Sequence, residues 1–327
     1  MTSGASQIPS PLCDATPLCI AKGGELLRDG QLVAFPTETV YGLGANALDD
    51  KAVAAIYATK RRPDFNPLIV HVAGVAEAEL YVRFHDAAQR LAHAFWPGPL
   101  TLVLPRRADC SLSLLVSAGM DSVAVRAPQH SVARALLASA GVPIAAPSAN
   151  RSGNISPTSA EAVLEELGSD VAMILDGGPC SVGLESTIVG FQGERPVLLR
   201  AGAITRAQLE PLVGPFAAAD RGIQAPGMLA SHYAPRAQLR LNATDLSSGE
   251  ALLAFGAEIG GATQSCNLSA SGDLGEAAAN LFAMLRRLDK TGVATIAVMR
   301  IPEDGLGEAI NDRLRRAAAP RPASRVI

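Results

Sequence analysis

The sequence predicts an α/β protein: a mixed sheet with flanking helices, followed by a smaller α/β unit. Short apolar runs of strand length alternate with segments of helical periodicity along most of the chain, a pattern typical of helices that cover a sheet. Hydrophobic residues make up 48% of the 327 residues and charged residues 18%, which excludes an intrinsically disordered chain. The length exceeds that of most single domains and favours two.

Local start and stop signals place the first elements. Residues 32–35 form an apolar strand that ends at Pro36, and Asp49 with Asp50 can cap a helix that Pro63 stops. Further strands are expected at residues 68–72, 100–104, 123–125, 143–146, 173–175, 187–189 and 197–199. Further helices are expected at residues 87–95, from a cap at Ser131 to Gly141, and after a capping box of Thr158 and Glu161.

The periodicity weakens near residues 211–235, where Gly-Pro, Pro-Gly and Ala-Pro pairs concentrate. We therefore expect a larger domain at residues 15–214, a linker at 215–235 and a smaller domain at 236–327. In the smaller domain, strands are expected at residues 238–241, 252–255 and 295–299. They accompany a helix whose apolar face carries Leu274, Ala278, Leu281, Leu285 and Leu288.

Charge and cysteine content limit the class of protein. The 28 Lys and Arg residues against 31 Asp and Glu residues give a net charge of −3, which argues against a strongly basic nucleic-acid binder. The basic tail at Arg313, Arg315, Arg316, Arg321 and Arg325 is interpreted as a solvated end of the chain. Neither a signal peptide nor an apolar run near the ~20 residues of a membrane span is recognisable, so we expect a soluble, cytoplasmic protein.

The five cysteines are odd in number and widely spaced, at positions 13, 19, 110, 180 and 266. This spacing argues against a disulfide scaffold or a zinc ribbon and favours reduced thiols. The five histidines show neither an HxxxH nor an HExxH pattern, which argues against a structural transition-metal site.

Four polar clusters lie beside apolar strands, at residues 36–42, 122–126, 147–150 and 185–187. Ligands of open α/β sheets bind in the crevice beyond strand ends, and hydroxyls and amides there can orient a small polar ligand. Three cations, Lys60, Arg61 and Arg62, end a predicted helix and could clamp a polyphosphate. Two further arginines, Arg126 and Arg200, end apolar strands, where an anionic partner is expected.

Two other functions have partial support in the sequence. Residues 42–47 match a relaxed dinucleotide-binding pattern, but the separation from the preceding strand favours a tight turn. The same basic cavity could instead serve an RNA-binding module, although RNA readers usually show stacking aromatics and this chain has a single Trp.

Taken in order, the motifs resemble those of the threonylcarbamoyl-AMP synthases, the YrdC-type family, in their long two-domain form. The resemblance covers about residues 20–319. It is carried by PTETVYGLG at 36–44, KRRP at 60–63, NPL at 66–68, WPGPLT at 96–101, RAP at 126–128, PSAN at 147–150, SPT at 156–158, ESTI at 185–188, PGM at 226–228, HYAP at 232–235 and NDRL at 311–314. It implies a YrdC-like twisted open mixed sheet and a smaller Rossmann-like domain.

The resemblance also implies a reaction, that of a nucleotidyltransferase. Threonine, bicarbonate or carbon dioxide, and ATP would give threonylcarbamoyl-AMP and pyrophosphate. A separate transferase would then use the product to modify adenosine in tRNA, so stable direct binding of tRNA by this chain is not expected. Magnesium would arrive with the ATP phosphates, since no dedicated carboxylate cage is visible, and no protein-bound metal or prosthetic group is expected.

The family likeness assigns site residues. The catalytic set is Lys60, Arg62, Ser148 and Asn150. The ATP-binding set is Arg62, Asn66, Ser122, Asn150, Ser156, Arg200 and Tyr233. The threonine-binding set is Thr39, His71, Arg126, Ser148 and Ser186, with Arg126 on the carboxylate.

Overall fold

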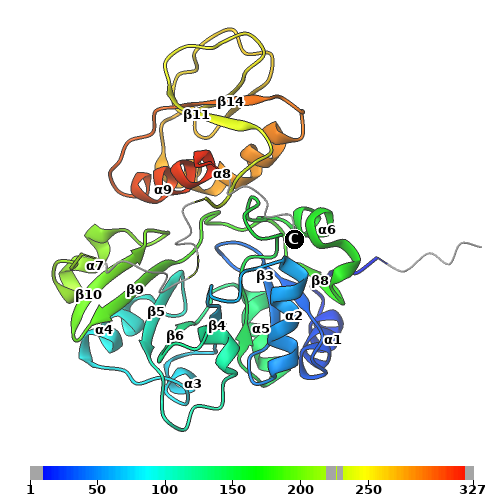
Figure 1. Cartoon of the computed structure of the whole chain (residues 1–327), viewed down its shortest axis with the longest axis vertical. Coiled ribbons are helices and arrows are strands. Elements are labelled where there is room, and N and C mark those ends of the chain that lie inside the picture. Colours follow the sequence, from blue (N-terminus) through cyan, green and yellow to red (C-terminus); the bar gives the residue numbers. More distant parts are fainter. Residues whose placement is uncertain (1–9, 219–225, 227–230, 321–327) are drawn as a thin grey trace, which may run out of the picture.

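The computed structural model describes residues 10–218, 226 and 231–320 of the chain. These residues form two sheets with helices on them, which confirms the predicted mixed α/β fold with a smaller α/β part at the C-terminal end (Figure 1). Of the predicted linker at 215–235, residues 219–225 and 227–230 lie outside the described residues. No helix within the described residues is long and apolar enough to cross a membrane.

The large sheet of the described residues contains ten strands in the order β1-β8-β2-β3-β7-β4-β6-β5-β9-β10, with both parallel and antiparallel pairs. The strands are β1 (Leu12–Asp14), β2 (Val33–Phe35), β3 (Gly42–Asn46), β4 (Ile69–His71), β5 (Leu100–Pro105), β6 (Ser122–Arg126), β7 (Ile144–Ala145), β8 (Met173–Asp176), β9 (Thr187–Gln192) and β10 (Arg195–Arg200). Non-consecutive neighbours bring loops that are distant in sequence to common edges of the sheet.

The helices of this part cover the sheet on both faces. They are α1 (Pro17–Arg28), α2 (Asp50–Lys60), α3 (Val75–Ala78), α4 (Asp86–Phe95), α5 (Ser131–Ala140), α6 (Ala160–Leu167) and α7 (Arg206–Val213), with 3-10 turns η1 (Leu114–Ser117) and η2 (Gly168–Asp170). Helices α1 and α5 pack together on one face, over a core that includes Phe35 and Leu175. The remaining part of that face carries a small apolar cluster around Ile69 and Ala124, and this part leads to the pocket described below.

The glycine-rich segment at residues 42–47 is a strand, not the predicted tight turn. Strand β3 pairs antiparallel with β2, so the dinucleotide interpretation fails as well. A Cβ atom at Gly44 would lie 2.9 Å from both Ile144 Cγ2 and Phe35 Cε1. Glycine is therefore required by close packing inside the sheet and not by a phosphate.

Two helix starts differ from the prediction by one residue. Asp49 caps α2 as expected, accepting from Lys51 N and Ala52 N. The cap of α5 is His130, whose Nδ1 accepts from Val132 N, instead of Ser131. The cap of α6 is Ser159, whose hydroxyl accepts from Ala162 N, instead of Thr158. A difference of one residue is within the usual uncertainty of helix ends.

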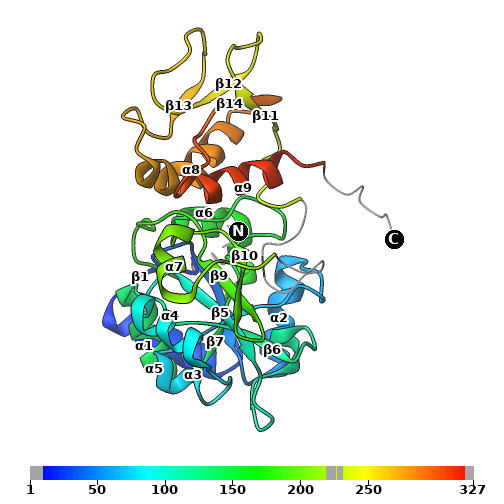
Figure 2. The ribbon, with the colours of Figure 1, turned by 90° about the vertical axis from the view of Figure 1, so that its left-hand side faces the viewer.

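The C-terminal part has a parallel four-stranded sheet of order β11-β14-β12-β13. Its elements are β11 (Gln238–Ala243), β12 (Ala251–Ala254), β13 (Ser265–Asn267), α8 (Leu274–Asp289), β14 (Thr295–Met299) and α9 (Gly307–Ala318). Both views place α8 and α9 between this sheet and the larger part of the chain (Figures 1 and 2). The two helices therefore form the face through which the parts meet.

The helix α9 corrects the interpretation of the basic tail. Arg313 is fully buried, and Arg315 and Arg316 occupy the last turn of this helix; Arg321 and Arg325 lie outside the described residues. Leu314 and Ile310 bury the apolar side of the helix, so the segment is part of a core and not a solvated end.

The cysteine prediction is partly wrong. Cys13 and Cys19 form a disulfide, with Cα atoms 6.6 Å apart. Cys13 lies in β1 and Cys19 in the first turn of α1, which follows after a short connection. The remaining three, Cys110, Cys180 and Cys266, are free as expected.

Candidate functional site

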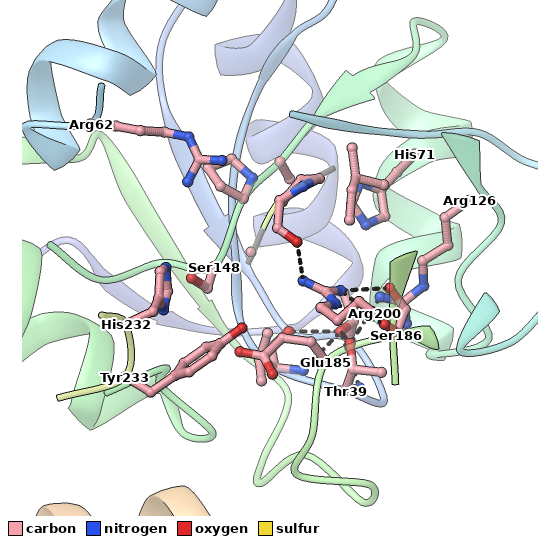
Figure 3. Close-up of a pocket in the computed structure, with 17 residues that line it drawn as sticks. Thr39, Arg62, His71, Arg126, Ser148, Glu185, Ser186, Arg200, His232 and Tyr233 are labelled. Carbon is pink, nitrogen blue, oxygen red and sulfur yellow. Dashed lines mark hydrogen bonds between the residues drawn. The ribbon is translucent and has the colours of Figure 1, made fainter. Parts of the chain in front are cut away.

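A pocket opens where several strand ends and loops of the large sheet meet the segment around residue 232 (Figure 3). Eight of the residues assigned from the sequence line it: Thr39, Arg62, His71, Arg126, Ser148, Ser186, Arg200 and Tyr233. They are widely separated along the chain. The order of strands in the sheet is what brings them together.

The register of the sheet places the pocket residues. His71 ends β4 and Arg126 ends β6, and the two are directly paired in a parallel register. Ser148 follows β7 and forms an isolated bridge with Gly42, while Thr39 lies in the connection between β2 and β3. The carboxyl ends of the parallel strands and the adjacent turns thus share one crevice.

Arg126 is held by three partners. Its Nη2 donates to Glu38 Oε1 at 2.5 Å, its Nη1 to Thr39 Oγ1 at 2.9 Å and its Nε to Gly98 O at 3.3 Å. Burial raises the pKa of Glu38, but the charge and hydrogen bond of Arg126 outweigh burial and leave that pKa below its ordinary value. Arginine has five N–H donors, so two remain for a ligand carboxylate.

His71 is buried and neutral. Burial, followed by the nearby charge of Arg126, lowers the pKa of His71 to about 3. Its ring lies edge-on to Phe35 with centroids 6.0 Å apart, and its Nδ1 has no hydrogen-bond partner among the described residues. A neutral imidazole with a free nitrogen can orient a polar ligand but does not supply positive charge.

A hydroxyl network lies beside Arg200. Ser186 Oγ and Thr101 Oγ1 are 2.7 Å apart, and Arg200 Nη2 donates to Ser186 Oγ at 3.1 Å. Arg200 Nη1 also donates to the carbonyl of Pro226 at 3.2 Å, which brings the inter-domain segment to the pocket. The site is therefore built from both strand ends and this segment.

Arg62 reaches the pocket from the end of α2. Its guanidinium is buried and donates to the carbonyls of Asn66 at 3.1 Å and Pro67 at 2.7 Å. Asn66 does not line the pocket, but it is fully buried and both atoms of its side-chain amide lack a partner among the described residues. Buried amides are normally hydrogen-bonded, so the unpaired amide beside Arg62 is an exception within this part of the chain.

Lys60 points into the protein instead of the pocket. Its Nζ donates to the carbonyl of Ser148 at 2.6 Å and to the carbonyl of Asn150. Burial, followed by the charge of Arg62, lowers the pKa of Lys60 well below its ordinary value. The side chain thus fixes the loop at residues 147–150 and does not itself face the cavity.

The other three assigned residues also lie outside the pocket lining. Asn150 Nδ2 donates to the carbonyls of Arg151 and Asn154, which shapes the same loop. Ser156 donates to Glu185 Oε1 at 2.6 Å and so helps to hold a carboxylate that lines the pocket. Ser122 begins β6, at the opposite end of that strand from Arg126, and lines a different pocket with His85.

Sequence reasoning missed two carboxylates of the site. Glu38 and Glu185 belong to motifs that the sequence singled out, yet neither received a role. Glu38 pairs with Arg126, and Glu185 lines the pocket between Ser156 and Arg313. A signal was available in the sequence, because buried cations need anionic partners. The strand-end arginines therefore called for carboxylates, and the polar clusters at residues 36–42 and 185–187 each contain one.

The described residues contain no group of three or more His, Cys, Asp or Glu side chains able to hold a metal ion. Glu185 is the single carboxylate among the described residues that line the pocket, and both its oxygens already accept hydrogen bonds. The pocket therefore does not fit a protein-bound divalent cation.

Comparisons with known proteins cover nearly the whole chain. A family model described as telomere recombination (Sua5, YciO, YrdC) matches residues 25–202. A second model, described as threonylcarbamoyl-AMP synthase, C-terminal domain, matches residues 204–319.

Curated relatives and a solved structure agree with these family models. The threonylcarbamoyl-AMP synthase of Bacillus subtilis is 42% identical, over 92% of this chain and 93% of the relative. That of Pyrococcus abyssi is 41% identical, over 90% of this chain and 92% of the relative. The crystal structure of P. abyssi Sua5 complexed with L-threonine matches with a TM-score of 0.86 and 38% identity, over 94% of this chain and 96% of that one.

Proposed function

The chain belongs to the threonylcarbamoyl-AMP synthase family, and we propose that it joins L-threonine, bicarbonate or carbon dioxide, and ATP into threonylcarbamoyl-AMP. The observation that carries the proposal is the pocket, in which Arg62, Arg126 and Arg200 converge on small hydroxyls, a set of cations suited to one carboxylate and a polyphosphate. The structure of the P. abyssi relative with L-threonine supports an amino-acid site in the same fold.

The reaction needs no protein nucleophile. The threonine amine adds to carbon dioxide and loses a proton, which gives a carbamate. A carbamate oxygen then attacks the α-phosphorus of ATP, and the bond to the bridging oxygen of pyrophosphate breaks. The chain would act by holding the two substrates in line and neutralising charge, which makes it a nucleotidyltransferase.

We assign threonine to the strand-end side of the pocket. The two free N–H donors of Arg126 would bind its carboxylate. Thr39, His71 and Ser186 would orient the amine and side chain, and Ser148 would contact both substrates. A neutral His71 suits this role because it can accept from or donate to the amino acid without attracting phosphate.

We assign the ATP phosphates to Arg62 and Arg200, with Asn66 and Tyr233 beside them. Lys60 and Asn150 would act through the loop that carries Ser148. Ser156 would act through Glu185. Ser122 is left out of this assignment, because it lies at the other end of β6 and lines a different pocket. In this assignment residues 15–214 form the catalytic domain, 215–235 the linker and 236–327 the C-terminal domain.

Magnesium would enter on the ATP phosphates, because the described residues of the pocket supply no free carboxylate for it. The product would pass to a separate transferase that modifies tRNA in the cytoplasm. Direct RNA binding by the basic cluster is disfavoured, since Lys60 and Arg62 are buried and face the interior and the pocket instead of an outer surface.

Release of pyrophosphate from ATP tests the proposal. The wild-type chain should release it only when threonine and bicarbonate are both present. Equal release with and without threonine would contradict the synthase assignment, and tight tRNA binding without ATP turnover would favour the RNA-binding alternative.

A further inference from the structure

The most buried ion pair between the two parts of the chain ends inside the proposed site. Arg313 of α9 is fully buried, and its Nε donates to Glu185 Oε2 at 2.9 Å. Glu185 is 128 residues away and lines the pocket. Its other oxygen accepts from Ser156 at 2.6 Å, so one carboxylate links the C-terminal helix to two loops of the larger part.

The same guanidinium also contacts the inter-domain segment. Arg313 Cζ lies 5.4 Å from the centroid of the Tyr233 ring, within the range of a cation–π contact. Tyr233 stacks on Phe282 of α8 with centroids 5.5 Å apart, and its backbone has a left-handed φ of 62°. Glu185 and Tyr233 lie next to each other in the pocket (Figure 3). Arg313 contacts both of them without lining the pocket itself.

Electrostatics explains why this arginine matters to a site for phosphates. Burial raises the pKa of Glu185, but the charges of Arg313 and Arg200 outweigh burial and keep it ionised. Without Arg313, a buried carboxylate in the pocket would lack its charge partner. It would then repel an incoming triphosphate and draw Arg200 toward itself.

We propose that Arg313 is a positioning residue of the substrate pocket. It balances the negative charge of Glu185 and packs against Tyr233, so that the C-terminal part completes the site. This inference rests on the proposed function. Arg313 does not itself line the cavity, so it acts through Glu185 and Tyr233 and is not a catalytic residue. The C-terminal part thereby gains a defined role in the reaction.

Charge rescue tests the inference. Arg313→Met should lower kcat/KM for ATP by about tenfold or more, mainly through KM, because charge-assisted contacts to phosphate are lost or opposed. Adding Glu185→Gln to that variant removes the unpaired carboxylate and should recover about threefold or more of the loss. Arg313→Lys keeps the charge and should fall between wild type and Arg313→Met.

The matched control is Glu308→Gln, since Glu308 lies on the same helix and pairs with Arg206 across the same interface at an exposed position. It should stay within about twofold of wild type. Thermal unfolding of every variant, followed by circular dichroism, separates loss of folding from loss of activity.

Three results would overturn the inference: wild-type kinetics in Arg313→Met, a double variant no better than Arg313→Met, or an equal loss in Glu308→Gln. If Arg313→Met does not fold, the double variant decides: activity supports the inference and inactivity overturns it. An inactive wild type contradicts the proposed function instead, so the two failures are distinguishable.

Discussion

Arg126 and Glu38 form an ion pair of 2.5 Å, with their side chains 4% and 6% exposed, at the edge of the pocket. The arginine assigned to the threonine carboxylate is thus already held in place by a carboxylate of the chain. Its orientation is fixed before threonine arrives, which reduces the ordering cost of binding.

Arg126→Lys should therefore weaken threonine binding selectively. A single ammonium cannot contact Glu38, Thr39 and a ligand carboxylate with the geometry of a guanidinium. We expect KM for threonine to rise by about tenfold or more, with a smaller change in KM for ATP. Steady-state pyrophosphate release measures both, and the exposed Arg134→Lys on α5 is the control. An unchanged KM for threonine would refute the assignment.

Arg62→Ala should weaken the binding of ATP and not that of threonine. Arg62 lines the pocket, whereas its neighbour Arg61 is exposed at the left-handed cap of α2. Loss of the guanidinium should raise KM for ATP by about tenfold or more, while Arg61→Ala should behave as wild type. Similar kinetics in the two variants would remove Arg62 from the phosphate site.

Lys60→Met should impair the site by destabilising the loop at residues 147–150. The substitution removes a donor that serves the carbonyls of Ser148 and Asn150. The Ser148 carbonyl keeps its bond from Asn150 N, whereas a buried Asn150 carbonyl left unpaired costs about 1–3 kcal/mol. We expect a lower free energy of unfolding in urea together with reduced kcat. A variant as stable as wild type would show that these hydrogen bonds do not hold the loop.

His71 should make stability depend on pH. Its folded-state pKa of about 3 lies below the ordinary value of 6.5, so below pH 6.5 the unfolded chain takes up a proton that the folded chain refuses. The contribution of neutral His71 to the free energy of unfolding is complete above pH 6.5. It falls as the pH falls toward 3, by up to about 1.4 kcal/mol per pH unit.

Between pH 6.5 and 4.5, His71→Gln should therefore lose about 2 kcal/mol less stability than wild type. Urea unfolding at both pH values measures the difference. The pKa values of His85, His130 and His232 are lowered as well, and these residues are present in both proteins. The exposed His93→Gln is the control and should keep the wild-type slope. Parallel losses in wild type and His71→Gln would contradict the buried neutral state.

Local patterns predicted much of the fold. Apolar runs located β4 and β14 within one residue, and the periodicity of leucines predicted α8. The strand at Gly42–Asn46 was missed because its glycines mimic a turn, and only the tertiary contact with Ile144 explains them. The helix at Gly307–Ala318 was missed because its arginines appear solvated until their partners are known.

The site was predictable to a similar degree. The resemblance identified residues such as Arg62 and Arg126 that the structure brings to one pocket. It did not reveal which cations face the ligand and which face the protein, because Lys60 and Arg62 lie two residues apart and only their tertiary partners distinguish their directions. The link from Arg313 to Glu185 joins distant segments and has no local signal.

The most direct test of the central claim is isolation of the product. Wild-type chain incubated with ATP, threonine and carbon-labelled bicarbonate should yield a compound that contains AMP, threonine and the labelled carbon in equal amounts, with one pyrophosphate for each. Pyrophosphate release without labelled carbon in an AMP adduct, or an adduct that forms without threonine, would contradict the account.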